Sequence, residues 1–238
     1  MGVIKYNGVH SEDFGIYVEH LPHYETPERD YENIHVPGRN GDLVIDKGSY
    51  KNVNRTYDVS LGTLEKSFDV LANRLTQWLN VSSGYLRLED TYEPDYYRMA
   101  LYKEARFVTN ILGNAARATI TFECKPQRFL KAGGISRSVT TSGTTLWNPT
   151  QFTALPILTV NGSGSGTINV GGYSVTISAI DTYITINSEI QDVYKSTVNK
   201  NSVVTMANGF PKLSAGNNTI SFSSGVTSVA IIPQWWTL

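Results

Sequence analysis

Charged residues are distributed very unevenly along the chain, and this distribution constrains its fold more than any motif does. Of the 41 charged residues, 34 lie in residues 1–131, and residues 132–238 carry the other seven. The second segment is rich in small polar residues instead, with 15 Ser, 16 Thr and 11 Gly. Domains commonly run to about 100–200 residues. The sequence therefore predicts two domains of different physical character, residues 1–131 and residues 132–238.

The balance of charge bears on the partners of the chain. Its net charge is −1, and neither segment carries a large excess of either sign. The sequence thus lacks the basic stripe that drives nucleic-acid binding through counterion release. The single cysteine, Cys124, excludes an internal disulfide. The N-terminus lacks the apolar stretch of a signal peptide, and no run of about 18 apolar residues occurs. We expect a protein that is made in a cytoplasm and is not inserted into a membrane.

The first segment has the pattern of a β-sheet covered by one helix. Apolar and polar side chains alternate over residues 53–61 and again over residues 118–123, as in half-buried strands. Between residues 64 and 80 the apolar side chains recur at a spacing of three to four, among them Leu75 and Trp78. The sequence predicts an N-terminal β-sandwich with one amphipathic α-helix.

A turn signal lies between two of the expected strands, in residues 36–45. Pro37 and Gly38 favour a turn, and Asn40-Gly41 is the dipeptide typical of a type I′ hairpin. On this turn chemistry alone, the segment is predicted to be a tight hairpin.

Four acidic residues, Glu89, Asp90, Glu93 and Asp95, crowd a turn that Pro94 interrupts. They could be read as a glycosidase pair or a calcium site. A glycosidase needs one carboxylate in an apolar setting and a second one at a fixed separation, and the spacing of a calcium loop is absent. We predict a solvated loop.

Other catalytic and metal-binding patterns are also missing from the sequence. All four histidines lie in the first 35 residues and match no compact zinc spacing. The chain has no Gly-x-Ser-x-Gly elbow, and Cys124 lies in an alternating strand pattern where a cysteine more often packs than reacts. We expect a chain that is not an enzyme and has no metal and no cofactor.

The second segment shows only strand patterns. A two-residue Gly171-Gly172 turn would pair Val170 with Tyr173, and Ile168 with Val175. Residues 161–166, Asn-Gly-Ser-Gly-Ser-Gly, lie between two strand signals and are predicted to form a flexible hairpin loop rather than a phosphate-binding loop, because no helix follows. Several short strands in about 100 residues indicate a jelly-roll-like β-sandwich.

Aromatic residues are frequent in this segment, and Trp235 and Trp236 are adjacent. Neighbouring side chains of a strand point to opposite faces, so one of the two is expected in a core and the other at a surface or contact. We take both as candidates for an exposed aromatic contact. Exposed rings on a β-sandwich can stack on sugars, although a core or interface use is the commoner one.

The order of these segments resembles that of the distal tail proteins of bacteriophages with long, non-contractile tails. The resemblance covers most of the chain. In the first segment it rests on Asn7-Gly8, Asp13-Phe14-Gly15-Ile16, residues 36–43, Trp78-Leu79 and residues 122–129. In the second it rests on residues 155–160, 187–194, 208–213 and 216–220.

The resemblance implies a structural protein of the virion tail tip, made in the host bacterial cytoplasm. N-terminal domains would form a six-fold ring, a homo-oligomer, with galectin-like C-terminal sandwiches around the outside. Partners would be the tail-tube protein on one side and a tail-associated fibre, hub or receptor-binding protein on the other. DNA would pass through the lumen without specific binding. In such a ring the 36–45 hairpin, with Arg39, Asn40 and Asp42, is the candidate contact with a neighbouring subunit.

Two other functions stay open from the sequence. The chain could be a carbohydrate-binding module that recognises host cell-wall saccharide. It could also be a wall hydrolase that uses Glu89, Asp90 or Asp95 as acid or base. We prefer the hypothesis of a ring-forming tail-tip protein, because the segment order supports it and a ring subunit needs no set of catalytic residues.

Overall fold

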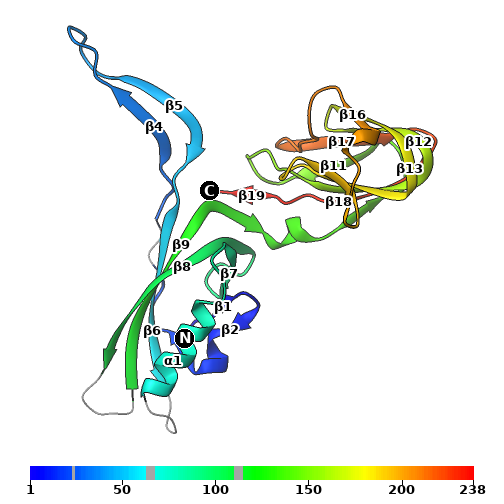
Figure 1. The fold of residues 1–238 in the computed structure, drawn as a ribbon. Coiled ribbons are helices and arrows are strands. Elements are labelled where there is room, and N and C mark those ends of the chain that lie inside the picture. Colours follow the sequence, from blue (N-terminus) through cyan, green and yellow to red (C-terminus); the bar gives the residue numbers. More distant parts are fainter. Residues whose placement is uncertain (23–24, 63–67, 110–114) are drawn as a thin grey trace. The chain divides into compact units, whose positions relative to one another are not determined.

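A computed structural model describes residues 1–22, 25–62, 68–109 and 115–238. The chain divides into two compact units, one formed by Met1–Arg128 with Leu238 and the other by Phe129–Thr237. We call them unit 1 and unit 2, and each is mainly β (Figure 1). The predicted fold class, a mainly β chain with one α-helix in its N-terminal part, is confirmed for the described residues.

Unit 1 is built on one curled sheet with the strand order β2-β1-β7-β8-β9-β6-β3. Its helices are η1 (Ser11–Phe14), a 3-10 helix, and α1 (Phe68–Leu79). Its strands are β1 (Ile4–Tyr6), β2 (Val9–His10), β3 (Ile16–Val18), β4 (Arg29–Ile34), β5 (Leu43–Tyr50), β6 (Val53–Gly62), β7 (Leu86–Asp90), β8 (Tyr96–Thr109) and β9 (Ala115–Leu130).

The pairing of β6 with β9 confirms the two alternating segments of the sequence. The pairing is antiparallel and runs from Val53↔Cys124 to Gly62↔Ala115. Alternate side chains such as Tyr57, Ile120 and Phe122 are buried in one core. Burial raises the pKa of the Cys124 thiol to about 12, so this cysteine packs as an inert side chain.

Helix α1 packs on this sheet through its buried side chains Leu75, Trp78 and Leu79. The Trp78 indole donates a hydrogen bond to the Tyr6 carbonyl oxygen at 3.3 Å and stacks on Phe14 at a centroid distance of 5.2 Å. The predicted helix is confirmed over residues 68–79, whereas its predicted start at residue 64 lies outside the described residues.

Strands β4 and β5 form a separate two-stranded sheet in which Ile34 pairs with Leu43. Eight residues therefore connect the strands, and the predicted type I′ turn at Asn40-Gly41 is wrong, because that turn needs positive φ at both residues and only Gly41 has it (φ 80°). A turn with both φ values positive occurs at Asn7-Gly8 instead, at 51° and 80°, between β1 and β2.

Unit 2 contains two short 3-10 helices, η2 (Lys131–Gly134) and η3 (Asn201–Val203). Its strands are β10 (Arg137–Val139), β11 (Thr144–Asn148), β12 (Ile157–Val170), β13 (Tyr173–Asn187), β14 (Asp192–Lys195), β15 (Val198–Asn199), β16 (Val204–Met206), β17 (Gly216–Phe222), β18 (Val226–Ile232) and β19 (Trp236–Thr237).

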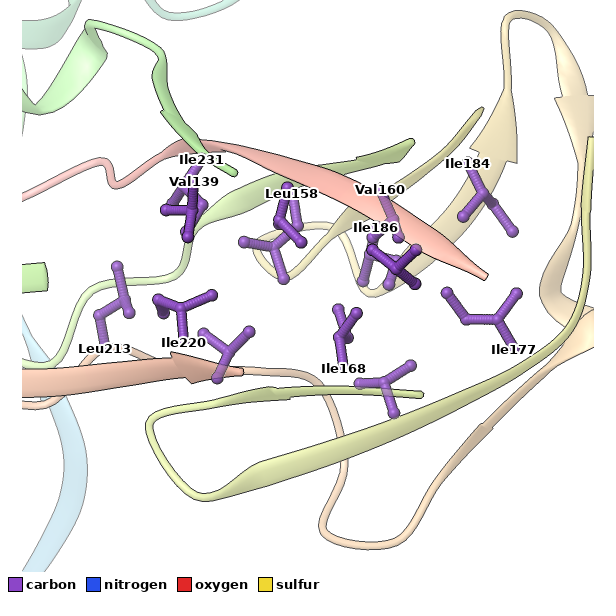
Figure 2. Packing of buried hydrophobic residues seen from close by; sticks show 14 of the residues in the cluster. Val139, Leu158, Val160, Ile168, Ile177, Ile184, Ile186, Leu213, Ile220 and Ile231 are labelled. Carbon is purple, nitrogen blue, oxygen red and sulfur yellow. The ribbon is translucent and has the colours of Figure 1, made fainter. Parts of the chain in front are cut away.

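Two long strands, β12 and β13, serve both layers of the unit 2 sandwich. The first half of β12 pairs with β18 and the second half with β17, while β13 pairs with β16 and then β14. One layer thus has the order β10-β18-β12-β13-β14-β15, and the other β11-β17-β12-β13-β16. In Figure 2 the side chains of Ile168, Ile177 and Ile220 face those of Leu158 and Ile186 across the core.

The hairpin predicted at Gly171-Gly172 is confirmed, with Val170↔Tyr173 and Ile168↔Val175 in register. The flexible loop predicted for residues 161–166 is wrong, because these residues continue β12 through a bulge between Gly164 and Gly166.

Gly162 of this segment and Gly225 before β18 allow a close approach of two backbones. A Cβ on Gly162 would lie 2.0 Å from the Gly225 carbonyl oxygen, and a Cβ on Gly225 would lie 2.1 Å from that of Ser165. The segment is therefore the corner at which β12 passes from one layer to the other, a position where strands bend and glycine is favoured.

Candidate subunit interface

The hairpin of β4 and β5, residues 29–50, is the feature of unit 1 that its own core does not explain. We call it the arm. Figure 1 shows it extending beyond the main sheet of the same unit. Most of its residues are exposed, and within the described residues β4 and β5 pair only with each other. An isolated two-stranded hairpin is at best marginally stable in water. The arm therefore has the character of a segment completed by another molecule.

One face of the arm carries an apolar strip. Ile34 pairs with Leu43, and Ile45 follows two residues later on the same face. These three side chains are 39%, 41% and 44% exposed. On the opposite face Tyr31 and Val44 are exposed as well. Adjacent exposed apolar side chains are typical of interaction sites.

Ion pairs and ring contacts, rather than a core, hold the base of the arm together. Arg29 forms an ion pair with Asp46 and lies over the Tyr50 ring at 5.4 Å. The Gly48 backbone N–H donates to Asp46 at 2.8 Å, and this bond, with the Arg29 charge, holds the pKa of the exposed Asp46 carboxyl below its usual value. Such surface pairs add little stability. They involve none of the three side chains of the apolar strip.

The predicted contact residues Arg39, Asn40 and Asp42 lie in the exposed loop between β4 and β5. Asp42 approaches His35 within the same loop, with 3.2 Å between its Oδ1 and the His35 Nδ1, so this carboxylate has a partner within the chain. A contact of these loop residues with a neighbouring subunit stays a prediction. The sequence interpretation missed Ile34, Leu43 and Ile45, although the alternation of Leu43 and Ile45 was a visible signal.

The acidic turn after β7 differs from its prediction. Asp90 and Glu93 have side chains only 5% and 10% exposed, so the solvated loop is wrong for both residues. Asp90 accepts hydrogen bonds from Arg55 at 3.0 Å and from the Tyr57 hydroxyl at 2.7 Å. Glu93 pairs with three arginines, at 3.3 Å from Arg55, 3.3 Å from Arg98 and 2.7 Å from Arg128. We call these six residues the ion-pair cluster.

Burial alone would raise the pKa of Asp90. The hydrogen bond from Tyr57 and the charge of Arg55 outweigh that effect, and the net pKa of Asp90 lies below its usual value. Burial raises the pKa of Tyr57 well above its usual value, and the Asp90 charge acts in the same direction. The cluster therefore holds an ionised carboxylate against a neutral phenol and a charged guanidinium, which is a structural arrangement.

The two adjacent tryptophans in unit 2 are not the exposed pair that the sequence suggested. Trp235 is buried in the core of unit 2, so its prediction as an exposed contact is wrong, while the expectation that one of the two enters a core holds. Trp236 is half-buried, stacks on Phe152 at 4.4 Å and donates to the Thr153 carbonyl oxygen at 3.0 Å. A partner contact at Trp236 remains a prediction.

No group of three His, Cys, Asp or Glu side chains among the described residues could hold a metal ion. His23 lies outside the described residues. In the described part of the chain, no helix has the length and apolar character needed to cross a membrane.

Comparison with solved structures finds chains of similar fold. The structure is similar to the crystal structure of the SPP1 Dit (gp 19.1) protein, described as a paradigm of the hub adsorption apparatus in phages that infect Gram-positive bacteria. The TM-score is 0.78, the sequences are 14% identical, and the alignment covers 100% of both chains. No protein-family model and no curated protein sequence matches the chain. The predicted resemblance is thus confirmed at the level of the fold, over the full length of the chain.

Proposed function

We propose that the chain is a structural subunit of a bacteriophage tail hub, a ring at the distal end of the tail tube that links the tube to the host-adsorption apparatus. The observation that carries the proposal is the fold likeness to the Dit protein of SPP1, which covers both chains completely. A shared fold does not fix function by itself, so the argument needs support from the surface of this chain.

The arm supplies that support. A protein with an exposed apolar hairpin can place it against the next copy. A head-to-tail contact of this kind closes into a ring when the rotations between successive copies add up to a full turn. The strip of Ile34, Leu43 and Ile45 is suited to be the buried centre of the contact, because the centre of an interface between copies is more apolar than its rim. The loop with Arg39, Asn40 and Asp42 would lie at its rim.

The charge balance supports the proposal in a second way. A tail hub surrounds a channel through which DNA passes, and dense contacts between lysine or arginine and phosphate would hold the DNA back. The net charge of −1 suits a conduit better than a DNA-binding protein. In this proposal the ring is six-fold, lies at the virion tail tip, and binds the tail-tube protein and a fibre, hub or receptor-binding protein.

The wall-hydrolase alternative loses support from the ion-pair cluster. A glycosidase acid must keep its proton near neutral pH, which requires a raised pKa. The pKa of Asp90 is lowered instead, and Glu93 is held by arginines. Glu89 accepts a hydrogen bond from Arg87 at 2.7 Å. These carboxylates serve the fold.

The proposal is tested by assembly with the purified tail-tube protein. We expect the full chain to cap one end of tube segments, visible by negative-stain microscopy, and to co-sediment with them. A chain that binds neither the tube ends nor other copies of itself would contradict the proposal.

A further inference from the structure

One outer face of the unit 2 sandwich has an unusual composition. The layer β11-β17-β12-β13-β16 turns the side chains of Leu146, Ile168 and Ile220 into the core and the alternate ones outward. All five strand segments are described, and every outward side chain in them is Ser, Thr, Asn or Trp. The strands of this face therefore contribute no charged side chain to it.

Trp147 is the one large apolar side chain on this face. It lies on β11 opposite Asn217 of β17 and is 60% exposed. Atoms of its indole ring lie 3.6 and 3.9 Å from the position that a Cβ on Gly216 would take. The ring thus leans over a residue without a side chain on the neighbouring strand, and this contact supports it as a platform.

Polar side chains extend from Trp147 along β17 and onto β12, in rows set by the strand register. Thr145 lies opposite Thr219, and Ser221 lies opposite Asn169. The Asn169 Oδ1 accepts a hydrogen bond from the Gly172 backbone N–H at 3.1 Å, which fixes the amide and leaves its NH₂ as a donor. A strand rises about 3.4 Å per residue and neighbouring strands are about 4.8 Å apart, so Asn169, two strands across and four residues along from Trp147, lies roughly 17 Å from it, a span that an extended polysaccharide can cover.

The composition of the face narrows the class of ligand. An anionic ligand would find no cationic side chain on it, and a protein partner would find one aromatic anchor without the apolar surroundings that interface cores have. A sugar offers an apolar ring face, which stacks on an indole, and hydroxyl groups, which pair with Asn, Ser and Thr. We propose that this face binds a neutral polysaccharide, with Trp147 as the stacking platform and Asn217, Thr219 and Asn169 as hydrogen-bonding groups.

This site is a property of unit 2 and does not depend on ring formation, so its failure would leave the hub proposal untouched. The test applies the full chain to an array of neutral and anionic bacterial glycans and titrates any glycan that binds by isothermal titration calorimetry, whose signal does not depend on the tryptophan that the variants remove. We expect at least one neutral glycan to bind. Trp147→Ala should weaken binding at least tenfold, and Trp147→Phe should keep part of it.

The matched control is Ile190→Ala, which removes an equally exposed apolar side chain from the turn between β13 and β14. Its binding should equal that of the unmodified chain. Circular dichroism must show the same fold for all variants. The proposal is overturned if no neutral glycan binds, if only anionic glycans bind, or if a folded Trp147→Ala protein binds as well as the original. The proposal is also overturned if a neutral glycan binds and Ile190→Ala weakens the binding as much as Trp147→Ala does.

Discussion

At the scale of single residues, the stability of unit 1 depends on carboxylates that are almost fully removed from water. Asp90 is the acceptor for Arg55 and Tyr57, both of which are buried. Removing one member of a buried pair leaves an uncompensated charge, which costs more than the pair itself contributes.

Asp90→Ala should therefore lower the free energy of unfolding of unit 1 by about 3–5 kcal/mol. The measurement is equilibrium urea unfolding by circular dichroism, with hydrogen exchange in β6 to assign the loss to unit 1. Asp95→Ala is the matched control, because Asp95 is an exposed carboxylate of the same turn and should cost less than about 0.5 kcal/mol. Equal losses in the two variants would show that the cluster does not stabilise the unit.

The pH dependence of stability follows from the lowered pKa of Asp90. Its contribution is complete above the unfolded-state value of about 3.9 and is lost as the pH falls through the lower folded-state pKa. Between pH 7 and pH 3 the original chain should lose more stability than Asp90→Ala does. Urea midpoints at several pH values measure this difference. Parallel pH profiles for the two proteins would contradict the assignment.

The ion-pair cluster could not be predicted from the sequence. Asp90 is separated by 35 and 33 positions from its partners Arg55 and Tyr57, and Glu93 by 35 positions from Arg128. A local interpretation sees only acids around a proline, which is typical of a solvated turn. The order of strands β7, β8, β9 and β6 in the sheet brings the arginines close to these acids. Local sequence patterns do not predict that strand order.

At the scale of the elements, local chemistry decides which predictions succeed. The Gly171-Gly172 hairpin was predictable because its two-residue turn and alternating flanks are local signals. The glycines of residues 161–166 were misread, since Gly162 and Gly166 must be small because of Gly225 and Val226, which meet them only in the folded sandwich. Glycine marks a close approach as often as a loop, and only the fold distinguishes the two.

Gly162→Ala tests the corner of β12. A Cβ there would collide with the Gly225 carbonyl oxygen at 2.0 Å, so we expect a loss of about 1–3 kcal/mol, or more if the strand cannot shift. Gly134→Ala is the control, because a Cβ there meets nothing within 4 Å and its φ is not positive. Thermal unfolding of both variants measures the difference. A Gly162→Ala protein as stable as Gly134→Ala would contradict the close approach.

The arm is tested by Leu43→Ser combined with Ile45→Ser. Fully burying a leucine or isoleucine side chain contributes about 1.5–3 kcal/mol. Leu43 and Ile45 are 41% and 44% exposed, so assembly can bury only that share of each, and removing both should raise the concentration needed for assembly by at least about tenfold. Analytical ultracentrifugation over a range of concentrations measures it.

Two controls accompany the arm variant. Val198→Ser with Ile190→Ser changes two exposed apolar side chains of unit 2 and should leave assembly unchanged. Arg39→Ala with Asp42→Ala tests the loop itself. An intact ring at low concentration would show that those two residues do not contribute to the interface. Unchanged assembly of the Leu43→Ser, Ile45→Ser variant would show that the arm is not part of the interface.

At the scale of the whole molecule, the sequence predicts more than its local patterns suggest. The order of the segments over the full chain resembles distal tail proteins, and the fold likeness also covers the full chain. Fold class survives at 14% identity because it depends on the spacing of apolar and turn residues. Contacts between copies depend on a few exposed side chains, and a sequence pattern does not tell which surface of a second copy they would meet, so the ring stays a proposal.

The solution mass of the purified full chain, measured by multi-angle light scattering, tests the central claim most directly when the same sample is imaged by negative stain. The chain has a mass of 26.3 kDa, so a six-fold ring of six such copies has a mass of about 158 kDa. We expect this mass for the purified chain by itself, or for its share of the complex after the tail-tube protein is added. We also expect ring-shaped particles with a central hole in the images. A chain that stays at 26.3 kDa in both conditions, without ring-shaped particles, would contradict the assignment as a tail hub.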